Sequence, residues 1–94
     1  MIIPLDPIPN QRFSCNINGQ NCVFELVMRG VNLFMNLSVN DEVIINGIIC
    51  LNKINLIPYN YLDFNGQLYF EDLQGNSDPF YFGLGTRWVL NYVQ

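Results

Sequence analysis

The residue types that carry most catalytic chemistry are scarce in this chain of 94 residues, which contains no histidine. Histidine is the usual general acid–base group near neutral pH and the commonest metal ligand, so its absence excludes most nucleophile–base pairs. The three cysteines are Cys15, Cys22 and Cys50, and their spacing matches no zinc-binding pattern. We therefore expect a protein that is not an enzyme, with no catalytic residue, no metal and no cofactor.

The carboxylates also lack an arrangement that would support chemistry. A glycosidase holds two of them across a cleft, and a calcium loop places oxygen ligands at alternating positions. The segment Asn76-Ser77-Asp78 is too sparse for a calcium loop, and the pairs Asp41-Glu42 and Glu71-Asp72 flank expected turns. We expect these acids to lie on a solvated surface.

The low content of charged residues is the main indication of function in the composition. Only 13% of the residues are charged, against about 25% in a typical soluble domain. The net charge is −4, and the four cations are too few and too scattered for the basic patch of a nucleic-acid-binding protein. A surface that carries asparagine and apolar side chains in place of charge is expected to be covered by other proteins.

The N-terminus and the apolar segments indicate no export or membrane anchoring. No stretch approaches the roughly 20 apolar residues of a membrane span. The first nine residues have no basic region, and Pro4, Pro7 and Pro9 interrupt their apolar run, so we do not expect a signal peptide. The chain is expected to be made in a reducing cytosol.

Alternation of apolar and polar residues predicts β-strands, most clearly from Val31 to Val39. An Asn-Gly pair between apolar runs favours a hairpin, because both residues tolerate positive φ. A two-residue turn at Asn18-Gly19 brings an aromatic pair, a thiol pair and an ion pair into one register. These pairs are Phe13–Phe24, Cys15–Cys22 and Arg12–Glu25.

A second turn, at Arg29-Gly30, would extend this hairpin into a three-stranded antiparallel meander over residues 11–39 with one buried face. Its predicted pairs are Met28–Val31, Leu26–Leu33, Phe24–Met35 and Cys22–Leu37. A Cys15–Cys22 disulfide is one possibility in this meander. Free buried thiols are favoured, because cross-strand disulfides are strained and the expected compartment is reducing.

The rest of the chain also predicts short strands separated by turns. Asn40-Asp41 is expected to turn the chain into residues 42–45, and Asn46-Gly47 to form a tight turn or bulge before residues 48–51. Residues 52–60 are expected to form a loop, 61–64 and 67–71 a hairpin around Asn65-Gly66, 74–79 a loop, and 86–93 a last strand. This last strand would place Trp88, Leu90 and Tyr92 on one face. The pattern predicts an all-β fold, a small antiparallel β-sandwich or partly closed barrel of about seven short strands.

Two aromatic or glycine-rich features allow more than one interpretation. Phe34 shares its strand face with Asn32, Asn36 and Ser38, so it belongs either to the edge of a second core or to a contact surface, and we favour the contact. The segment Phe82-Gly83-Leu84-Gly85 could suggest a phosphate loop, but no lysine and no helix pattern accompany it. We expect a bend or bulge there.

Several short motifs occur in an order that resembles a known family. They are Ile3-Pro4-Leu5 with Pro9-Asn10-Gln11 and Phe13, then the alternating Leu33, Met35, Leu37 and Val39, then an Asn-Gly turn with an Ile-Ile-x-Leu strand, then Tyr61, Leu62, Phe64, Gly66 and Leu68, then Leu84, Gly85, Leu90, Tyr92 and Val93. In this order the chain resembles the small baseplate plug proteins of contractile-tailed bacteriophages of the cyanophage type. The region around Lys53 and Asn55 departs from that family, which usually has a glycine there.

The resemblance implies a virion structural protein in the baseplate of a phage tail, assembled in the host cytoplasm. It would close the tip of the tail tube near the hub, in several copies around the axis, in contact with other hub or baseplate proteins, the tube or the spike. Its sites would be interfaces: an N-terminal arm, the face around Phe34 and the loop of residues 77–82. The alternatives are another tail assembly protein and a small ligand-binding β-barrel. The residues expected at interfaces are Ile2, Ile3, Leu5, Ile8, Phe34, Phe80, Tyr81 and Phe82.

The expected domain organisation is an extended, proline-rich N-terminal arm over residues 1–10 and a single β domain over residues 11–94. An arm with Pro4, Pro7 and Pro9 is poor in backbone donors. We expect it to dock on a neighbouring protein, so that deletion of residues 1–9 would leave a folded core and abolish assembly.

Overall fold

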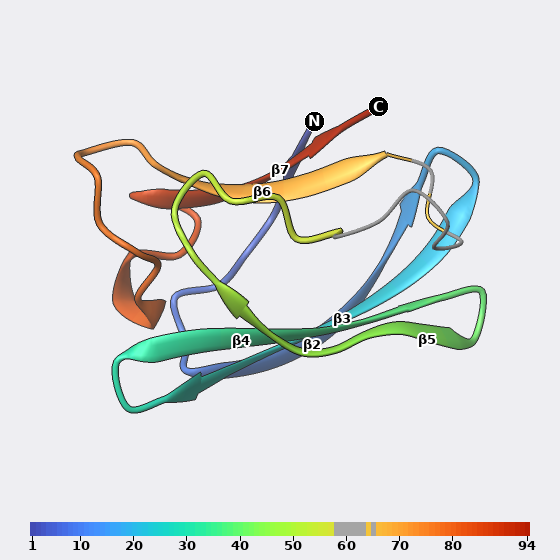
Figure 1. Ribbon diagram of the computed structural model, residues 1–94, viewed down its shortest axis with the longest axis horizontal. Coiled ribbons are helices and arrows are strands. Elements are labelled where there is room, and N and C mark those ends of the chain that lie inside the picture. The colour runs from blue at the N-terminus through green and yellow to red at the C-terminus, as the bar shows by residue number, and fades with distance from the viewer. Residues whose placement is uncertain (58–63, 65) are drawn as a thin grey trace.

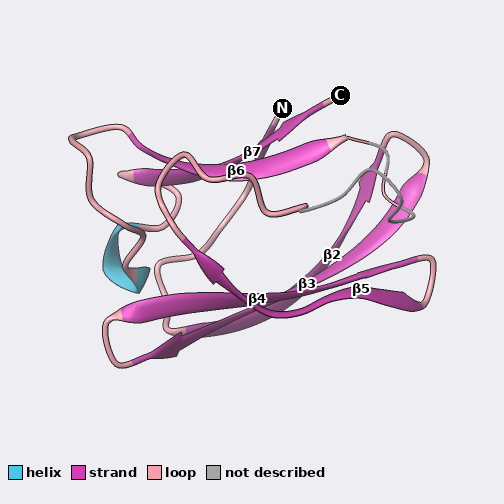
Figure 2. Cartoon of the chain, viewed as in Figure 1, coloured by secondary structure: helices cyan, strands magenta, loops and turns pink. Residues whose placement is uncertain are grey.

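The computed structural model describes residues 1–57, 64 and 66–94, which form two packed antiparallel sheets (Figures 1 and 2). One sheet has the order β2-β3-β4-β5 and the other the order β1-β7-β6. The strands are β1 (Ile2–Ile3), β2 (Asn10–Ile17), β3 (Gln20–Arg29), β4 (Asn32–Val39), β5 (Glu42–Cys50), β6 (Gln67–Asp72) and β7 (Trp88–Val93), with a 3-10 helix η1 (Tyr81–Gly83). The predicted all-β sandwich is confirmed, and the sheets do not close into a barrel.

The predicted register of the first hairpin is confirmed. β2 and β3 pair so that Phe13 faces Phe24, Cys15 faces Cys22 and Arg12 faces Glu25. Asn18 and Gly19 form the turn with φ of 53° and 81°, the left-handed backbone of a type I′ hairpin. The Phe13 and Phe24 rings stack at 5.2 Å on the side that faces the other sheet.

The predicted register of β3 with β4 is wrong by two residues. The turn is Gly30-Val31 rather than Arg29-Gly30, so Leu26 faces Met35 and Phe24 faces Leu37. Gly30 has a φ of 63°, and a two-residue turn with positive φ at its first position favours glycine there. A shift by two residues keeps each side chain on its face of the strand, so the predicted apolar face is retained.

β4 turns into β5 at Asn40-Asp41, as expected, with φ of 50° and 69°. Asn46-Gly47 forms a bulge inside β5 and not a turn, because Met35 pairs with Ile48 while Leu37 pairs with Ile45. Gly47 has a φ of 74°, and its N–H donates to Asn36 Oδ1 at 2.6 Å. A second register shift follows between Leu37 and Ser38, so β5 is irregular along its length.

The second sheet is built from the two ends of the chain. β6 pairs with β7, and Trp88, Leu90 and Tyr92 are buried on one face as predicted. The loop expected after residue 51 runs alongside β6. The N–H groups of Lys53 and Leu56 donate to the carbonyls of Phe70 and Leu68 at 2.7 and 2.8 Å, respectively. Of the hairpin expected around Asn65-Gly66, residues 61–63 and Asn65 lie outside the described residues, and Phe64 is described but does not lie in a strand. The loop at residues 74–79 is confirmed.

The first residues of the predicted arm pack on their own chain. β1 pairs with β7 and forms an edge of the second sheet, with Ile3 opposite Leu90. The N-terminal ammonium of Met1 donates to the carbonyl of Tyr92 at 3.1 Å, and the Tyr92 N–H donates to the Met1 carbonyl at 2.8 Å. Ile3 is 1% exposed and belongs to the core, because β1 closes the space between the sheets.

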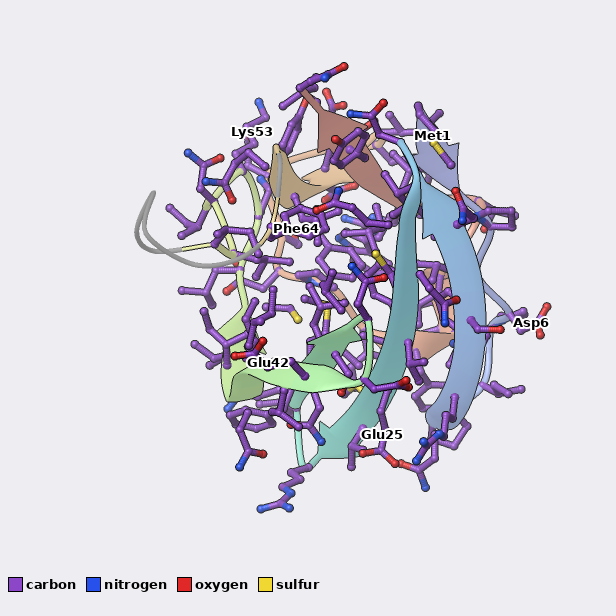
Figure 3. All side chains as sticks on the ribbon, turned by 90° about the vertical axis from the view of Figure 1, so that its right-hand side faces the viewer. Met1, Asp6, Glu25, Glu42, Lys53 and Phe64 are labelled. Carbon is purple, nitrogen blue, oxygen red and sulfur yellow. The ribbon has the colours of Figure 1, made fainter. Side chains whose placement is uncertain are left out.

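The core fills the space between the two sheets with aliphatic and aromatic side chains from every strand. Phe64 is 7% exposed and lies among them, with its ring edge-on to Tyr92 at 5.8 Å (Figure 3). The largest fully buried side chains are Phe24, Phe70, Ile3, Ile17, Leu26, Leu33, Met35, Leu37, Leu56, Leu68, Leu84 and Leu90. An interior of this kind leaves its apolar groups out of water and supports a single folded unit.

The two residues of β1 provide a direct test of whether the N-terminus belongs to the fold. Ile3→Ala should destabilise the protein by about 2–5 kcal/mol, because it leaves a cavity in the core. Ile2→Ala is the matched control, since Ile2 is 58% exposed on the same strand and its truncation should cost roughly 0.5 kcal/mol or less. Urea unfolding of the two variants measures both values. Equal small losses would show that β1 does not contribute to the core.

Candidate interface surfaces

The N-terminal segment presents some of its predicted interface residues and buries others. Ile2 and Ile8 are 58% and 42% exposed, so both offer apolar surface to a partner. Leu5 is half-buried and packs against the core, and Ile3 is fully enclosed. A Cβ at Gly85 would lie 2.5 Å from the Leu5 carbonyl oxygen, so the backbones of the arm and of the loop after η1 are in close approach. An interface through the arm stays a prediction for Ile2 and Ile8.

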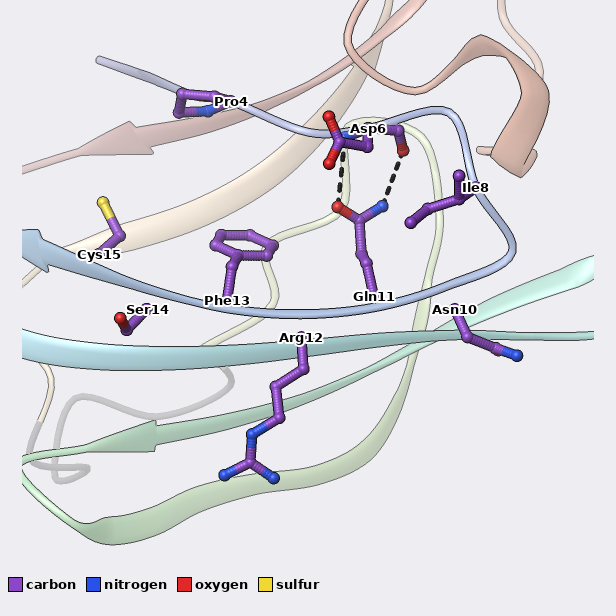
Figure 4. Close-up of a pocket in the computed structure, with 9 residues that line it drawn as sticks. All are labelled: Pro4, Asp6, Ile8, Asn10, Gln11, Arg12, Phe13, Ser14 and Cys15. Atoms are coloured by element: carbon purple, nitrogen blue, oxygen red, sulfur yellow. Dashed lines mark hydrogen bonds between the residues drawn. The ribbon is translucent and has the colours of Figure 1, made fainter.

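Beyond β1, the arm is held against β2 by a side chain of that strand. The Gln11 side-chain amide donates from Nε2 to the Asp6 carbonyl at 2.8 Å and accepts the Asp6 N–H on Oε1 at 3.2 Å (Figure 4). A groove of about 580 Å³ lies between the arm and β2. It is lined by Pro4, Asp6, Ile8 and the β2 residues from Asn10 to Cys15.

Phe34 lies on the outer face of the four-stranded sheet, and the contact predicted for it stays a prediction. Its partners across the sheet are Val27 on β3 and Ile49 on β5, so three apolar side chains form a row on this face. Phe34 and Val27 are half-buried and Ile49 is 37% exposed. The Arg29 guanidinium carbon lies 6.0 Å from the centre of the Phe34 ring. In the described chain no second layer covers this row, so Phe34 is not the edge of a second core.

The loop between β6 and β7 carries an aromatic cluster around η1. Phe82 is 62% exposed, yet its ring makes edge-on contacts with Phe80, Tyr81 and Trp88 at 5.2, 6.4 and 5.8 Å between centroids. Phe80 and Tyr81 are half-buried and pack on the core. A Cβ at Gly83 would lie 2.5 Å from the Trp88 ring, so glycine is required there for packing. The expected bend at this glycine-rich segment is confirmed as a 3-10 turn.

A buried ion pair holds this loop, and the expectation of a solvated surface is wrong for its acid, Asp72. Asp72 is 5% exposed and accepts two hydrogen bonds from Arg87, Nε to Oδ1 and Nη2 to Oδ2, each at 2.9 Å. The same carboxylate accepts the N–H groups of Gln74 and Ser77, both at 2.9 Å. These partners hold the pKa of Asp72 well below its usual range, and the carboxylate raises the pKa of Arg87.

The ion pair also supports the aromatic cluster, because Arg87 packs against the ring of Trp88. The Arg87 guanidinium lies 4.5 Å from the centre of the Trp88 ring, and Trp88 Nε1–H donates to the Ser77 carbonyl at 3.0 Å. The Asp72 N–H in turn donates to Asn52 Oδ1 at 2.9 Å. One local pattern could have indicated this network. Asp72 ends a strand, and its carboxylate can accept a hydrogen bond from the N–H of the turn residue two positions later, Gln74.

The cysteines are free thiols in this fold. Burial raises the pKa of the Cys22 thiol to about 11 and that of the Cys50 thiol to about 12, so both are protonated and unreactive at neutral pH. Cys15 is half-buried and lines the groove beside the arm. Among the described residues no cluster of three His, Cys, Asp or Glu side chains could hold a metal ion, and no helix is long and apolar enough to cross a membrane.

Apart from the buried Ile3, the predicted interface residues therefore lie on two separate parts of the surface. The arm and the aromatic loop adjoin through Leu5 and Gly85. Phe34 lies on the outer face of the other sheet, away from both.

The thiols should differ in their reactivity. Iodoacetamide at pH 8 should modify Cys15 first, because its side chain is partly accessible, while Cys22 and Cys50 should react only after unfolding. Mass spectrometry of peptides from native and urea-treated protein gives the extent of labelling at each site. Rapid labelling of Cys50 in the native protein, or a Cys15–Cys22 crosslink under non-reducing conditions, would contradict this assignment.

The ion pair should make stability depend on pH in the acid range. A carboxyl whose pKa is lowered on folding stabilises the fold above the pKa of the unfolded chain, about 3.9, and loses that contribution as pH falls further. Asp72→Asn should therefore lower the melting temperature at pH 7 and reduce its dependence on pH below about 4. Glu71→Gln is the matched control, since Glu71 has no ion pair of this kind with any residue that the structure describes. Thermal unfolding followed by Trp88 fluorescence measures both, and an unchanged acid dependence in Asp72→Asn would refute the role of this carboxylate.

The comparisons with known proteins add one positive result. A family model described as the cyanophage baseplate Pam3 plug gp18 matches residues 1–94, the whole chain. The comparison with curated proteins returns no match.

Proposed function

The chain belongs to the cyanophage baseplate plug family, and we propose that it closes the tip of the tail tube through protein–protein contacts. Family membership implies a location in the tail baseplate, association with other baseplate components and a structural role. The finer proposal is a position at the axis of a contractile tail, beside the hub, in several copies. Its partners would be hub proteins, the tail tube or the spike, assembled in the host cytoplasm.

The exposure of Phe82 is the observation that carries this proposal. A phenylalanine that is 62% exposed leaves apolar surface in water, which is unfavourable unless a partner covers it. The ring is not on a free loop, because Phe80, Tyr81 and Trp88 contact it. The Trp88 ring in turn contacts Arg87, which Asp72 holds through two hydrogen bonds. A rigid aromatic side chain loses little conformational entropy when it is buried, which makes it a suitable centre for an interface.

The alternative of a small ligand-binding β-barrel finds less support. The two sheets do not close, and the space between them is filled by the core. The groove of about 580 Å³ lies at the surface, between the arm and β2. Another role in tail assembly remains the second candidate, and it differs from the plug in where the protein is found in the finished tail.

Substitution of Phe82 in the phage tests the proposed contact. Phe82→Ala should weaken incorporation into baseplates at least roughly 30-fold, the equivalent of about 2 kcal/mol for a central aromatic contact. The variant phage should show fewer plugged tube tips in electron micrographs and a lower titre. Val31→Ala is the matched control, because Val31 is 75% exposed at a hairpin turn outside the predicted interfaces.

Two results would count against the proposal. If Phe82→Ala tails carried the protein and infected at the level of the unmodified phage, the aromatic loop would not be the contact. If antibody labelling of finished tails located the protein away from the tube tip, or did not detect it, the plug role would be wrong and an assembly role would be favoured.

A further inference from the structure

The four sheet edges of the sandwich differ in how well they are protected. β1 is an edge of only two residues, and residues 52–56 run beside β6 with hydrogen bonds to Leu68 and Phe70. β5 carries two register shifts, which disrupt pairing with a further strand. β2 is different, because all eight of its residues pair regularly with β3. Within the described chain, no strand pairs with its other side.

The outward backbone groups of β2 can be assigned from the register. In an antiparallel pair, hydrogen-bonded and non-hydrogen-bonded positions alternate. The Met28 N–H donates to the Pro9 carbonyl at 2.9 Å, so odd-numbered residues of this segment direct their backbone groups to β3. The N–H and C=O groups of the even-numbered residues therefore point out of the sheet, and among the described residues no backbone group pairs with them. These residues are Asn10, Arg12, Ser14 and Asn16.

We propose that this edge pairs with β2 of a second copy of the chain, antiparallel about a two-fold axis at Phe13. In this register Arg12 lies opposite Ser14 of the second copy, and Asn10 lies opposite Asn16 of the second copy. All outward backbone groups of the four residues then meet outward groups of the other strand. The two four-stranded sheets become one continuous sheet of eight strands.

Charge and shape favour a second copy in this register. A shift by two residues in one direction sets Arg12 opposite itself, and like charges directly opposite are destabilising. The opposite shift sets Ser14 opposite itself and leaves Asn10 without a partner. In the proposed register, the two Phe13 rings meet at a non-hydrogen-bonded position, where cross-strand side chains approach most closely.

The groove between the arm and β2 supports the same arrangement. Residues of the β2 edge line it, and Phe13 among them is half-buried, although the Phe24 ring against which it stacks is fully buried. Phe13 of the second copy would lie at the mouth of the groove and cover the exposed part of the first ring. An isologous contact of this kind closes after two copies and does not propagate.

The isolated full-length chain tests the pairing, so the result does not depend on the proposed role in the baseplate. Sedimentation equilibrium should give a dimer for the unmodified chain and for Ser14→Ala. Ser14→Pro should weaken the dimer at least ten-fold, because proline removes an outward N–H that the β2–β3 ladder does not use. Circular dichroism verifies that the proline variant is folded. A monomer at 100 μM or so for the unmodified chain, or an unchanged dimer in Ser14→Pro, would overturn the proposal.

Charge substitutions at the same position test the register. Ser14→Asp should strengthen the dimer a few-fold, because it would face Arg12 of the second copy, and Ser14→Lys should weaken it by a similar factor. If Ser14→Asp weakened the dimer, Ser14 would face itself and the proposed axis would be wrong.

Amide hydrogen exchange gives a second, independent measurement. The Arg12 and Ser14 amides should exchange slowly in concentrated protein and quickly on dilution, while the Phe13 and Cys15 amides stay slow throughout. Protection of Arg12 and Ser14 that required added baseplate protein, and not concentration, would assign this edge to a different partner and refute the second copy.

Discussion

Left-handed turn residues determine which side chains of the four-stranded sheet reach the core. Asn18, Gly19, Asn40 and Asp41 all have positive φ, and each pair connects two strands through the shortest possible loop. A two-residue turn fixes the register of the strands that it connects. The apolar residues of β2, β3 and β4 therefore lie on the same face of the sheet. The second sheet can then pack against a continuous apolar face.

The aromatic loop depends on a different interaction, since it has almost no regular secondary structure. Asp72 ends β6 and accepts four hydrogen bonds, two from Arg87 and one each from Gln74 and Ser77. A charged pair of this kind is costly to bury, and the number of hydrogen bonds compensates for the lost hydration. Phe82 is therefore exposed on a loop that these hydrogen bonds order, although the loop contains no strand and only a single turn of 3-10 helix.

Local patterns allowed the hairpin β2–β3, the turn at Asn40-Asp41 and the face of β7 to be predicted from sequence, because each depends on neighbours in the chain. The turn at Gly30-Val31 was predicted one residue too early, which shifts the register by two residues. Both registers keep the same apolar face, and only the location of glycine in the turn separates them. The burial of Ile3 and of Asp72 could not be predicted in this way. Both depend on partners far along the chain, Leu90 for Ile3 and Arg87 for Asp72. The low content of charged residues indicated an apolar surface, and several large apolar side chains are indeed exposed. That Phe34 lies apart from the aromatic loop could be seen only from the arrangement of the two sheets.

The pairing of β1 with β7 has a consequence for synthesis on the ribosome. The Met1 ammonium and the Tyr92 carbonyl that it contacts are 91 positions apart, so the segment around Met1 cannot pair with β7 until Tyr92 has left the exit tunnel. The hairpins of residues 10–50 involve only short-range closure and can form while translation continues. The nascent chain can thus form the four-stranded sheet early, and it completes the sheet of β1, β7 and β6 only after β7 has been synthesised.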